Sequence, residues 1–569
     1  MEKRWTIKAQ GDAGTVNKLS GELNISPLLA NLLVQRCITN FDEAKRFFRP
    51  SLDDLHDPFL MLGMDAAVTR IEQAIKQGEH IMVFGDYDVD GTTAVALVYT
   101  FLSKIYDRVS FYIPDRYKEG YGISKTGIDF AFEKGFKLII ALDCGIKSVN
   151  EIEYAKEKGI DFIICDHHLP GERVPNAVAV LDPKRPGCNY PYKELPGCAL
   201  GFKLAQAFAQ KNNIPREELE QYLDLVVVSI AADIVPITGE NRVLAYYGLK
   251  QINTSPRQGL KTLLELNNIK KELTITDLVF IIGPRINAAG RIDSGRKSVE
   301  LLISADATIA MESSIDINKH NLDRRDLDTT ITTQALEMIA TNEVMLKRKS
   351  TVVFHPGWHK GVVGIVASRL TEKYYRPTIV LTQSNGMISG SARSVKDFDV
   401  YEAINACSDL LEQFGGHKYA AGLSMKPENL DAFTEKFELV VSSTIQEHML
   451  VPEVEIDSKI NLQDINPKMF NVLKQFAPFG PGNMSPVFVS EDVLERGYAR
   501  VVGSNHLKLD LVSPSAPKNY YSAIAFGLAD KLPLVSSQKP FSVCYCIEEN
   551  VFNGVTSLQL NVKDVKSSS

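Results

Sequence analysis

Short apolar stretches alternate with helix-like stretches between residues 64 and 182, and this alternation constrains the fold more than any other feature. The apolar stretches predict strands at 80–86, 109–115, 137–143, 161–166 and 177–182. The intervening stretches predict helices at 64–78, 92–105, 122–135 and 148–159. Strands that are apolar along their whole length are typical of parallel sheets with both faces covered. We therefore expect a doubly wound α/β sheet.

Three of these predicted strands end in acidic residues or histidines. The residues at their ends are Asp86, Asp88, Asp90, Asp143, Asp166, His167 and His168. A fourth apolar stretch, LVVVSIAA, is followed by Asp233. In an open α/β sheet, ligands bind outside the carboxyl ends of the strands. Carboxylates at this density repel one another unless cations neutralise them, and oxygen ligands suit Mg²⁺ and Mn²⁺.

The main alternative for GDYDVDG is a calcium loop of the EF-hand type, which also opens with D-x-D-x-D-G. Such a loop needs Glu at its twelfth position, and counting from Asp86 that position is Leu97. Taken singly, Asp143 and Asp233 are also compatible with helix caps, and the two histidines with surface residues. Because several apolar elements each end in a ligand-type residue, the metal centre is the favoured interpretation.

The remaining chain divides by pattern into further segments. We expect an N-terminal helical segment (1–63), the α/β domain (64–250), a helical connector (251–347), a second α/β domain (348–449) and a C-terminal domain (450–569). Residues 309–346 lack Pro and Gly, which is compatible with one long helix. Five strand-like stretches within 486–565 predict a small barrel of the OB type. The turn-rich run FAPFGPGN occupies 476–483.

The overall charge is weakly acidic, with 63 basic and 70 acidic residues and a net charge of −7. Nucleic-acid binders are often basic, so a nucleic acid would have to be met by a local basic groove or through metal ions. The eight cysteines form no CxxC pair, which argues against structural zinc and disulfides. No apolar run resembles a signal peptide or membrane span, so we expect a cytoplasmic protein, and we expect a monomer.

The order DxDxDG, strand-end Asp, DHH (166–168) and ADIVP (232–236) resembles the DHH phosphoesterase superfamily. Further stretches extend the resemblance over nearly the whole chain, to the RecJ family of bacterial single-strand-specific exonucleases within it. They are IPDRYKEGYGIS (113–124), GPRINAAGR (283–291), HKGVVGIVASRL (359–370), SGSARS (389–394) and GGHKYAAG (415–422).

The resemblance implies a site for two divalent ions, Mn²⁺ or Mg²⁺. One ion would be bound by Asp86, Asp88 and Asp143, and the other by Asp90, Asp143, His167 and Asp233. Family proteins often have His at the position of Asp86. His168 would face the scissile phosphate, and Asp166 would orient a histidine.

The resemblance also implies contacts with phosphate and DNA, each with an ordinary alternative. SGSARS would bind a 5′-terminal phosphate or form a solvated polar segment, and GGHKYAAG would contact phosphate or form a glycine turn before a helix. Arg285, Asn287 and Arg291 would bind DNA phosphates or staple the helical connector. Arg116 and Tyr121 would contact the single strand, or Tyr121 would be a packed loop aromatic. His359 would touch the scissile phosphate or cap a helix. The residues concerned are Arg116, Tyr121, Arg285, Asn287, Arg291, His359, Ser389, Ser391, Arg393, Gly415, Gly416 and His417.

The function that the resemblance implies is 5′→3′ hydrolysis of single-stranded DNA to nucleoside 5′-monophosphates, in recombination and repair. Single-strand-binding protein and a helicase are the implied partners. Two alternatives stay open. One is a phosphodiesterase of the same superfamily that acts on short oligonucleotides or cyclic dinucleotides, or a pyrophosphatase. The other is a non-catalytic scaffold that binds single strands.

Overall fold

The computed structural model describes residues 2–552 and 554–568, which form two compact units. The first unit comprises Asp42–Arg324 together with Phe476–Met484. The second comprises the N-terminal residues up to Phe41, Arg325–Gln475 and the residues from Ser485 onward. Each unit is described by itself below.

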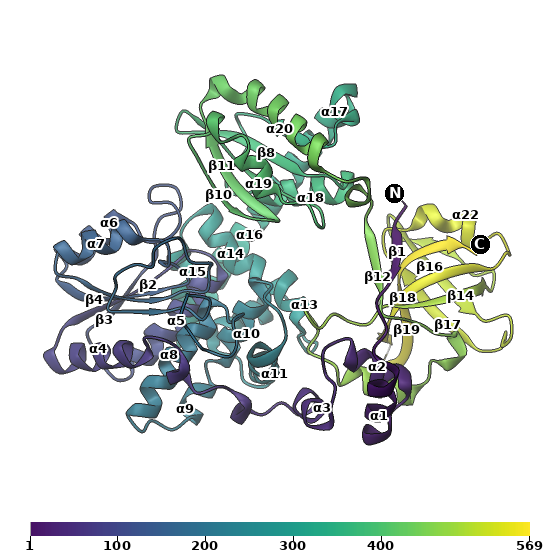
Figure 1. The fold of residues 1–569 in the computed structure, drawn as a ribbon, viewed down its shortest axis with the longest axis horizontal. Coiled ribbons are helices and arrows are strands. Elements are labelled where there is room, and N and C mark those ends of the chain that lie inside the picture. The colour runs from purple at the N-terminus through teal and green to yellow at the C-terminus, as the bar shows by residue number, and fades with distance from the viewer. Residues whose placement is uncertain (1, 553, 569) are drawn as a thin grey trace. The chain divides into compact units, whose positions relative to one another are not determined.

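The first unit is built on a five-stranded parallel sheet in the order β3-β2-β4-β5-β6. Helices α6 and α7 cover one face, and α4, α5 and α8 cover the other (Figure 1). This confirms the doubly wound α/β sheet. The bounds are β2 (His80–Gly85), β3 (Val109–Tyr112), β4 (Phe136–Leu142), β5 (Asp161–Cys165), β6 (Ala179–Leu181), α4 (Met64–Gln77), α5 (Val89–Ser103), α6 (Lys125–Glu133), α7 (Val149–Glu157) and α8 (Gly197–Lys211).

The apolar composition of the strands follows from burial on both faces. In β4, Leu138 and Ile140 pack against the face with α5 and α8, whereas Ile139 and Ala141 pack against the face with α6 and α7. Successive side chains of a strand point to opposite faces, so both positions must be apolar.

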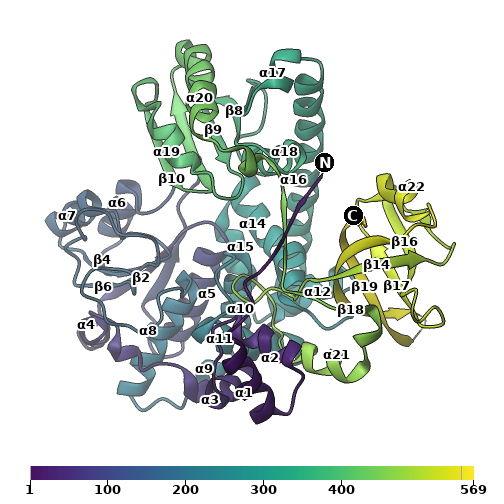
Figure 2. The same cartoon turned by 45° about the vertical axis from the view of Figure 1, so that its right-hand side comes forward.

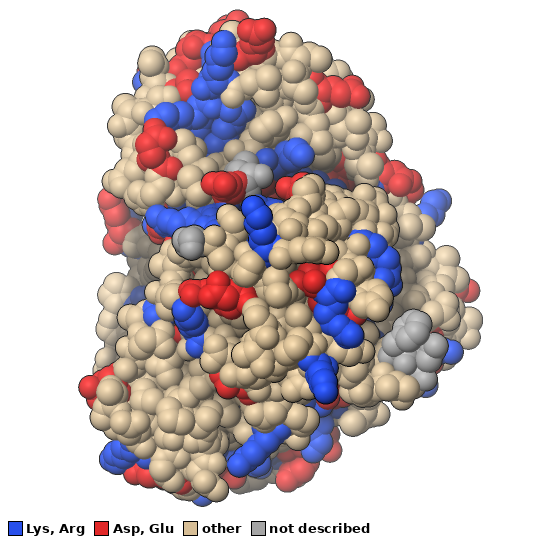
Figure 3. Space-filling view, turned by 90° about the vertical axis from the view of Figure 1, so that its right-hand side faces the viewer, with Lys and Arg blue, Asp and Glu red and all other residues tan. Residues whose placement is uncertain are grey.

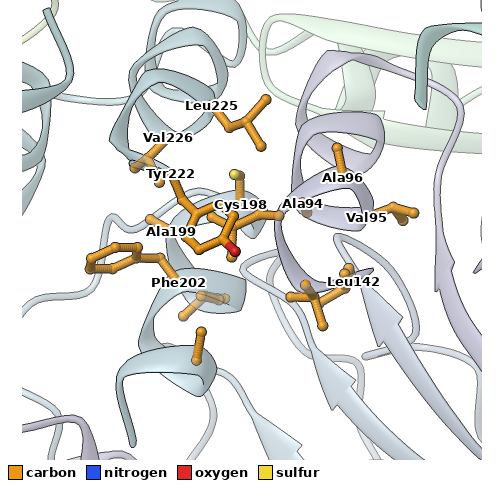
Figure 4. Close-up of a cluster of buried hydrophobic side chains, with 14 of the residues drawn as sticks. Ala94, Val95, Ala96, Leu142, Cys198, Ala199, Phe202, Tyr222, Leu225 and Val226 are labelled. Atoms are coloured by element: carbon orange, nitrogen blue, oxygen red, sulfur yellow. The ribbon is translucent and has the colours of Figure 1, made fainter. Parts of the chain in front are cut away.

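Helix α5 is buried along most of its length and packs against α8 and α10 (Leu223–Ala232). Figure 4 shows Ala94 of α5, Cys198 and Phe202 of α8 and Leu225 of α10 in one apolar cluster. Small residues at this crossing let the helices approach closely. The start of α5 is therefore held firmly against the core.

Helix α9 (Glu217–Glu220) precedes α10, and a series of helices follows α10. The bounds of those that follow are α11 (Gly239–Thr254), α12 (Gln258–Leu266), α13 (Ile275–Asp277), a π-helical turn (Leu278–Ile282), α14 (Gly283–Ile292), α15 (Gly295–Ile303), α16 (Ala307–Ala340) and α17 (Glu343–Lys347). The single helix considered over 309–346 is not formed, because α16 ends at Ala340. Asn342 accepts hydrogen bonds from the amides of Val344 and Met345 and so begins a new helix.

The second unit contains a five-stranded mixed sheet in the order β10-β11-β9-β8-β7. Helices α16 and α18 pack on one face, and α19 and α20 on the other (Figure 2). The bounds are β7 (Thr351–Phe354), β8 (Thr378–Ser384), β9 (Met387–Arg393), β10 (Gln413–His417), β11 (Ala420–Met425), α18 (Val363–Tyr374), α19 (Val400–Asn405) and α20 (Leu430–Thr444).

The C-terminal residues form the expected barrel. Strands β14, β18, β19, β17 and β16 pair in that order, and β16 pairs back with β14 to close the ring. The bounds are β13 (Ser458–Lys459), α21 (Pro467–Lys474), β14 (Phe488–Glu495), β15 (Arg500–Val502), β16 (His506–Val512), β17 (Tyr520–Ala525), α22 (Leu532–Val535), β18 (Phe541–Phe552) and β19 (Val555–Ser567).

The N-terminal segment contains the expected short helices α1 (Ala13–Leu23), α2 (Pro27–Val34) and α3 (Phe41–Phe48). It also contains a strand that the sequence pattern did not indicate. Strand β1 (Arg4–Ile7) pairs in parallel with β12 (Glu453–Ile456). A four-residue strand with only alternate apolar residues is too short to stand out by periodicity.

A buried ion pair fixes the start of α11. Glu240 lies 2.6 Å from the Nζ of Lys203, and it accepts hydrogen bonds from the Tyr190 hydroxyl and the His56 amide. Both charged side chains are almost fully buried. We expect Glu240→Ala to lower the free energy of unfolding by about 3–5 kcal/mol, because it leaves a buried cation without its partner.

Denaturant unfolding measures this change, and Glu343→Ala is the control. The pair of Glu343 with Lys347 is exposed, so its loss has little effect. A Glu240→Ala protein that unfolds at the wild-type denaturant midpoint would show that the buried pair contributes nothing.

Candidate metal centre

The first unit brings the predicted strand-end acids to one edge of its sheet. Asp86, Asp143 and Asp166 each follow the last residue of β2, β4 and β5. Asp143 has a left-handed backbone (φ 59°), which few side chains adopt without cost. A Cβ atom on Gly197, at the start of α8, would lie only 2.6 Å from the Cβ of Asp143. The tight turn at Asp143 therefore depends on glycine at position 197.

His167 lies among three carboxylates. Its Nε2 atom is 3.1 Å from Oδ1 of Asp143 and 3.6 Å from Oδ2 of both Asp90 and Asp233. His167, Asp90 and Asp143 are buried, whereas the side chain of Asp233 is 31% exposed. Two groups of ligand atoms share His167, one with Asp143 and His168 and one with Asp90 and Asp233. The Asp90, His167 and Asp233 atoms therefore suit one cation, whereas the other group includes His168 and contains neither Asp86 nor Asp88.

Asp90 is fixed by hydrogen bonds from two helices. Its carboxylate accepts from the amides of Gly197 (2.6 Å) and Cys198 (2.7 Å) at the start of α8, and from the Ser229 hydroxyl of α10 (2.7 Å). Amides at a helix N-terminus favour an anion. Ser229 and Gly197 were missed by the sequence analysis, because nothing in their local sequence distinguishes them from helix-packing residues.

Asp86 and Asp88 differ from Asp90 in how they are held. Asp88 begins α5, and its carboxylate accepts from the Gly91 amide (3.0 Å). Asp86 is fully buried, and neither of its oxygens has a well-formed hydrogen bond among the described residues. A Cβ atom on Gly91 would lie 2.5 Å from the Asp86 carbonyl oxygen, so this glycine is required for the turn.

Burial, and then the charge of neighbouring carboxylates, raises the pKa of Asp86, Asp88, Asp143 and Asp233. In each case the folded protein disfavours the ionised form. A divalent cation would offset the cost of ionising these carboxyl groups. A donor set of carboxylates with one imidazole suits Mg²⁺ or Mn²⁺. The Asp86 oxygens, which lack a well-formed hydrogen bond among the described residues, and the raised pKa values together fit the residues to such ions.

Asp166 and His168 form a separate pair at the rim of this cluster. Asp166 accepts from the amides of Ile146, His167 and His168 and from Nδ1 of His168 (2.7 Å). Although burial lowers the pKa of His168, the hydrogen bond and charge of Asp166 raise it to about 9. The hydrogen bonds likewise lower the pKa of Asp166 against the effect of burial. His168 is thus a half-exposed cation beside the acid cluster.

Tyr121 reaches the same rim. Its hydroxyl lies 3.3 Å from Nε2 of His168 and 3.2 Å from the carbonyl oxygen of Asp143. Arg116 stacks on the ring of Tyr87, with 5.0 Å between the guanidinium carbon and the ring centroid. Both residues predicted from DRYKEGYG therefore lie near the acid cluster.

The stretch GPRINAAGR forms most of α14. Its second glycine, Gly290, lies close to the GDYDVDG stretch that carries Asp86, Asp88 and Asp90. A Cβ atom on Gly290 would lie 2.4 Å from the Tyr87 carbonyl oxygen. Arg285 donates to the Ile281 carbonyl and to the side chains of Asn267 and Asn318. Asn287 and Arg291 lie on the same helix.

In the second unit, SGSARS and GGHKYAAG lie side by side in one sheet. SGSARS forms β9, where Ser389, Ser391 and Arg393 alternate and share a face. GGHKYAAG forms the β10–β11 hairpin, not a turn before a helix. Gly422 pairs with Gly415 on one side and Ser391 on the other.

Arg393 is a partly buried cation close to the start of α18. A Cβ atom on Gly364 would lie 3.0 Å from Nη2 of Arg393 and 3.3 Å from Oγ of Ser391. Among the described residues no carboxylate pairs with Arg393, whose guanidinium donates to the Ala392 carbonyl, and burial lowers its pKa. Such a site suits an anion. Of the other predicted phosphate contacts in this unit, His359 accepts a hydrogen bond from the Gly361 amide and His417 accepts one from the Tyr419 amide.

The surface charges do not form one broad basic track on the face drawn in Figure 3. Lys and Arg side chains are interspersed there with Asp and Glu. This agrees with the net charge of −7. Within residues 2–552 and 554–568, every helix is too short or too polar to span a bilayer.

Asp143 and Asp166 offer opposite tests of these electrostatics in the metal-free protein. Because the pKa of Asp143 is raised on folding, the folded protein binds more protons than the unfolded chain and loses stability as pH rises above about 4. We expect Asp143→Asn to stabilise the metal-free protein at pH 8 by a few kcal/mol, and to abolish stabilisation by Mn²⁺.

Asp166→Asn should have the opposite sign, because the pKa of Asp166 is lowered and its ionised form stabilises the fold above about pH 4. Thermal unfolding in a chelator, from pH 5 to 8, measures both variants. Destabilisation by Asp143→Asn under these conditions would contradict the assignment of an unneutralised charge to Asp143.

Comparison with known proteins identifies three matching family models. They are the DHH family N-terminal domain (residues 80–230), the DHHA1 domain (347–443) and the RecJ OB domain (456–564). The chain is 37% identical over 567 residues to the single-stranded-DNA-specific exonuclease RecJ of Bacillus subtilis, covering 99% of this chain and 70% of that protein. It is 34% identical to the RecJ of Haemophilus influenzae, covering 94% and 95%.

The structure also matches a solved relative. RecJ of Thermus thermophilus in complex with Mn²⁺ superposes with a TM-score of 0.85 at 27% identity, covering 100% of this chain and 80% of that chain. A second structure of the Thermus protein contains Mg²⁺ and gives a TM-score of 0.80. With sequence identity above 30% over nearly the full length and all three domain models in order, the chain belongs to the RecJ family.

Proposed function

We propose that this protein is a metal-dependent exonuclease that hydrolyses single-stranded DNA from its 5′ end and releases nucleoside 5′-monophosphates. The observation that carries the proposal is the buried set of carboxylates around His167, with the cationic His168 at its exposed rim. Membership of the RecJ family supports the substrate class, since the relatives named above are single-stranded-DNA-specific exonucleases.

Asp90, Asp143, His167 and Asp233 would hold one divalent ion, and Asp86, Asp88 and Asp143 a second. When bound, Mn²⁺ or Mg²⁺ supplies a Lewis acid that lowers the pKa of a water molecule and neutralises phosphate charge. The hydrogen bonds from α8 and Ser229 fix Asp90. These residues would therefore fix where the reacting phosphate lies.

His168 would stabilise the charge that develops on the scissile phosphate and donate a proton from Nε2 to the leaving 3′-oxygen. The Asp166 carboxylate holds the imidazole through Nδ1, which leaves Nε2 free to face Tyr121 and the substrate. The water oxygen would form the new bond to phosphorus as the bond to the 3′-oxygen breaks, the water proton would pass to solvent, and the leaving oxygen would take its proton from His168.

The polar strand face of the second unit would bind the 5′-terminal phosphate. Arg393, Ser391 and Ser389 supply a guanidinium and two hydroxyls on one face of β9. The remaining proposed contacts are His359, Gly415, Gly416 and His417. Holding the terminal phosphate would fix how far the strand enters, and so set both the 5′→3′ direction and the length of the product.

The rest of the strand would contact Arg116, Tyr121, Arg285, Asn287 and Arg291, and then the barrel. There, Tyr520 is half-exposed, and the Arg496 guanidinium lies 4.3 Å from its ring centroid, an arrangement suited to stacking with bases. Phe526 is exposed as well, whereas the Tyr521 hydroxyl is bonded to the Ile465 carbonyl. A role in recombination and repair, in the cytoplasm, with single-strand-binding protein and a helicase, completes the proposal.

The metal centre is tested by Asp88→Asn, because Asn keeps the cap of α5 but removes a charge. With Mn²⁺ and a 5′-phosphorylated single strand, we expect the wild type to release the 5′ label as a mononucleotide. We expect Asp88→Asn to lower kcat at least about 100-fold.

Asp316→Ala is the matched control. Asp316, Asp293 and His320 also cluster, but Lys297 lies 2.6 Å from both carboxylates and already neutralises them. Activity confined to dinucleotides, or release from the 3′ end, would refute the proposed reaction. Equal activity of Asp88→Asn and wild type would refute the proposed site.

The phosphate pocket is tested by Arg393→Gln. A charge-assisted hydrogen bond contributes about 1.5–3 kcal/mol, so KM for a 5′-phosphorylated strand should rise roughly 10- to 100-fold. KM for the same strand with a 5′-hydroxyl should change little. An equal rise for both substrates would place Arg393 outside the terminal-phosphate pocket.

A further inference from the structure

The turn-rich run FAPFGPGN occupies an unexpected place in the structure. Phe476–Met484 form part of the first unit, although Gln475 and Ser485 on either side belong to the second. We call Phe476–Met484 the inserted loop. A segment from the C-terminal part of the chain thus completes the unit that carries the metal centre.

The inserted loop has a defined internal structure. Asn483 is buried, and its side-chain amide donates to the carbonyls of Phe476 (2.8 Å) and Pro478 (2.9 Å). Backbone hydrogen bonds link Gly480 and Asn483 in both directions. Asn483 therefore closes the loop on itself, because a single side chain satisfies carbonyls from its first half.

The loop is also anchored to the first unit. The buried guanidinium of Arg242, on α11, donates to the carbonyls of Phe476 (2.9 Å) and Ala477 (3.0 Å). The ring of Phe476 is fully buried against Phe47 and Phe48. These contacts fix the loop at the start of α11, which directly follows the turn after Asp233.

The backbone of the inserted loop contacts the turn between Asp233 and α11. The Ile237 amide donates to the Pro481 carbonyl at 2.7 Å. A Cβ atom on Gly480 would lie 2.5 Å from Cγ1 of Ile237, and one on Gly482 would lie 2.9 Å from Cγ2 of Thr238. Glycine at 480 and 482 therefore allows the two backbones to approach.

The turn needs such support. Asp233 ends α10, and the next residue, Ile234, has a left-handed backbone (φ 58°) with its side chain 61% exposed. A β-branched residue in this conformation costs about 1–3 kcal/mol and persists only when its surroundings impose it. Tyr192 and Asn241 hold the Pro236 carbonyl, and the inserted loop holds Ile237.

We infer that the inserted loop is a positioning element for Asp233. By fixing the turn at Ile237, it holds the Asp233 carboxylate among the ligand atoms around His167. The inference rests on the proposed function, in which Asp233 binds a divalent ion. It extends the metal centre to residues about 250 positions further along the chain. The C-terminal part would then be needed for metal binding as well as for DNA.

The test is Mn²⁺ affinity of the full-length, metal-free protein, measured by calorimetry, with circular dichroism to confirm folding. We expect Asn483→Ala and Gly480→Ala each to weaken Mn²⁺ binding about 10- to 100-fold, the usual effect of losing a residue that orients a ligand. Gly480→Ala adds one methyl group against side-chain atoms only, so it keeps the test open if Asn483→Ala does not fold.

Two further variants make the result specific. Ser490→Ala removes an equally buried hydrogen bond within the barrel, to the Ile460 carbonyl, and should leave Mn²⁺ affinity unchanged. Adding Ile237→Ala to Gly480→Ala removes the atom that the new methyl group would strike, so the double variant should bind Mn²⁺ more tightly than Gly480→Ala.

Wild-type Mn²⁺ affinity in both loop variants would overturn the inference, and so would an equal loss in Ser490→Ala. Asp233→Ala separates this outcome from a failure of the proposed function. If Asp233→Ala binds Mn²⁺ as the wild type does, the proposed metal centre itself is wrong. If it loses Mn²⁺ and the loop variants do not, only the role of the inserted loop is refuted.

Discussion

The repulsion among buried carboxylates is the constraint on which the rest of the structure depends. Asp86, Asp88, Asp90, Asp143 and Asp233 meet at the end of an apolar sheet, where water cannot solvate all of them. The protein supplies donors unequally. Asp90 receives two helix amides and a hydroxyl, whereas the oxygens of Asp86 receive no well-formed hydrogen bond among the described residues. The unbalanced charge is what a pair of divalent ions would neutralise.

The sheet and the position of its acids were predictable from sequence, because burial on both faces makes every strand residue apolar until the strand ends. Asp143 and Asp166 therefore stand out as the first polar residues after β4 and β5. Ser229 could not be predicted in the same way. It is one polar residue in an apolar helix, and its bond to Asp90 exists only because α10 packs against α5.

Long-range contacts also place several of the predicted site residues. Two acceptors of Arg285, Asn267 and Asn318, come from other segments of the chain, so no local pattern marks these contacts. Likewise SGSARS and GGHKYAAG contain similar polar and glycine residues, but only the register of β9, β10 and β11 brings Ser391 beside Gly422. Each of these contacts joins residues far apart in the sequence, so a local sequence pattern predicts neither of them.

Close approach at glycine is the common means by which both neighbouring and distant segments support the acid cluster. A Cβ atom would lie 2.5 Å from the Asp86 carbonyl at Gly91, 2.6 Å from Asp143 at Gly197 and 2.4 Å from the Tyr87 carbonyl at Gly290. The acidic side chains gather around His167, so other segments support these loops by packing close to the loop backbone. A supporting segment without a Cβ atom makes that contact at the shortest distance. Gly480 lies in the same way against the side chain of Ile237, so residues far apart in the sequence surround the ligands, and the DHH motif supplies only some of them.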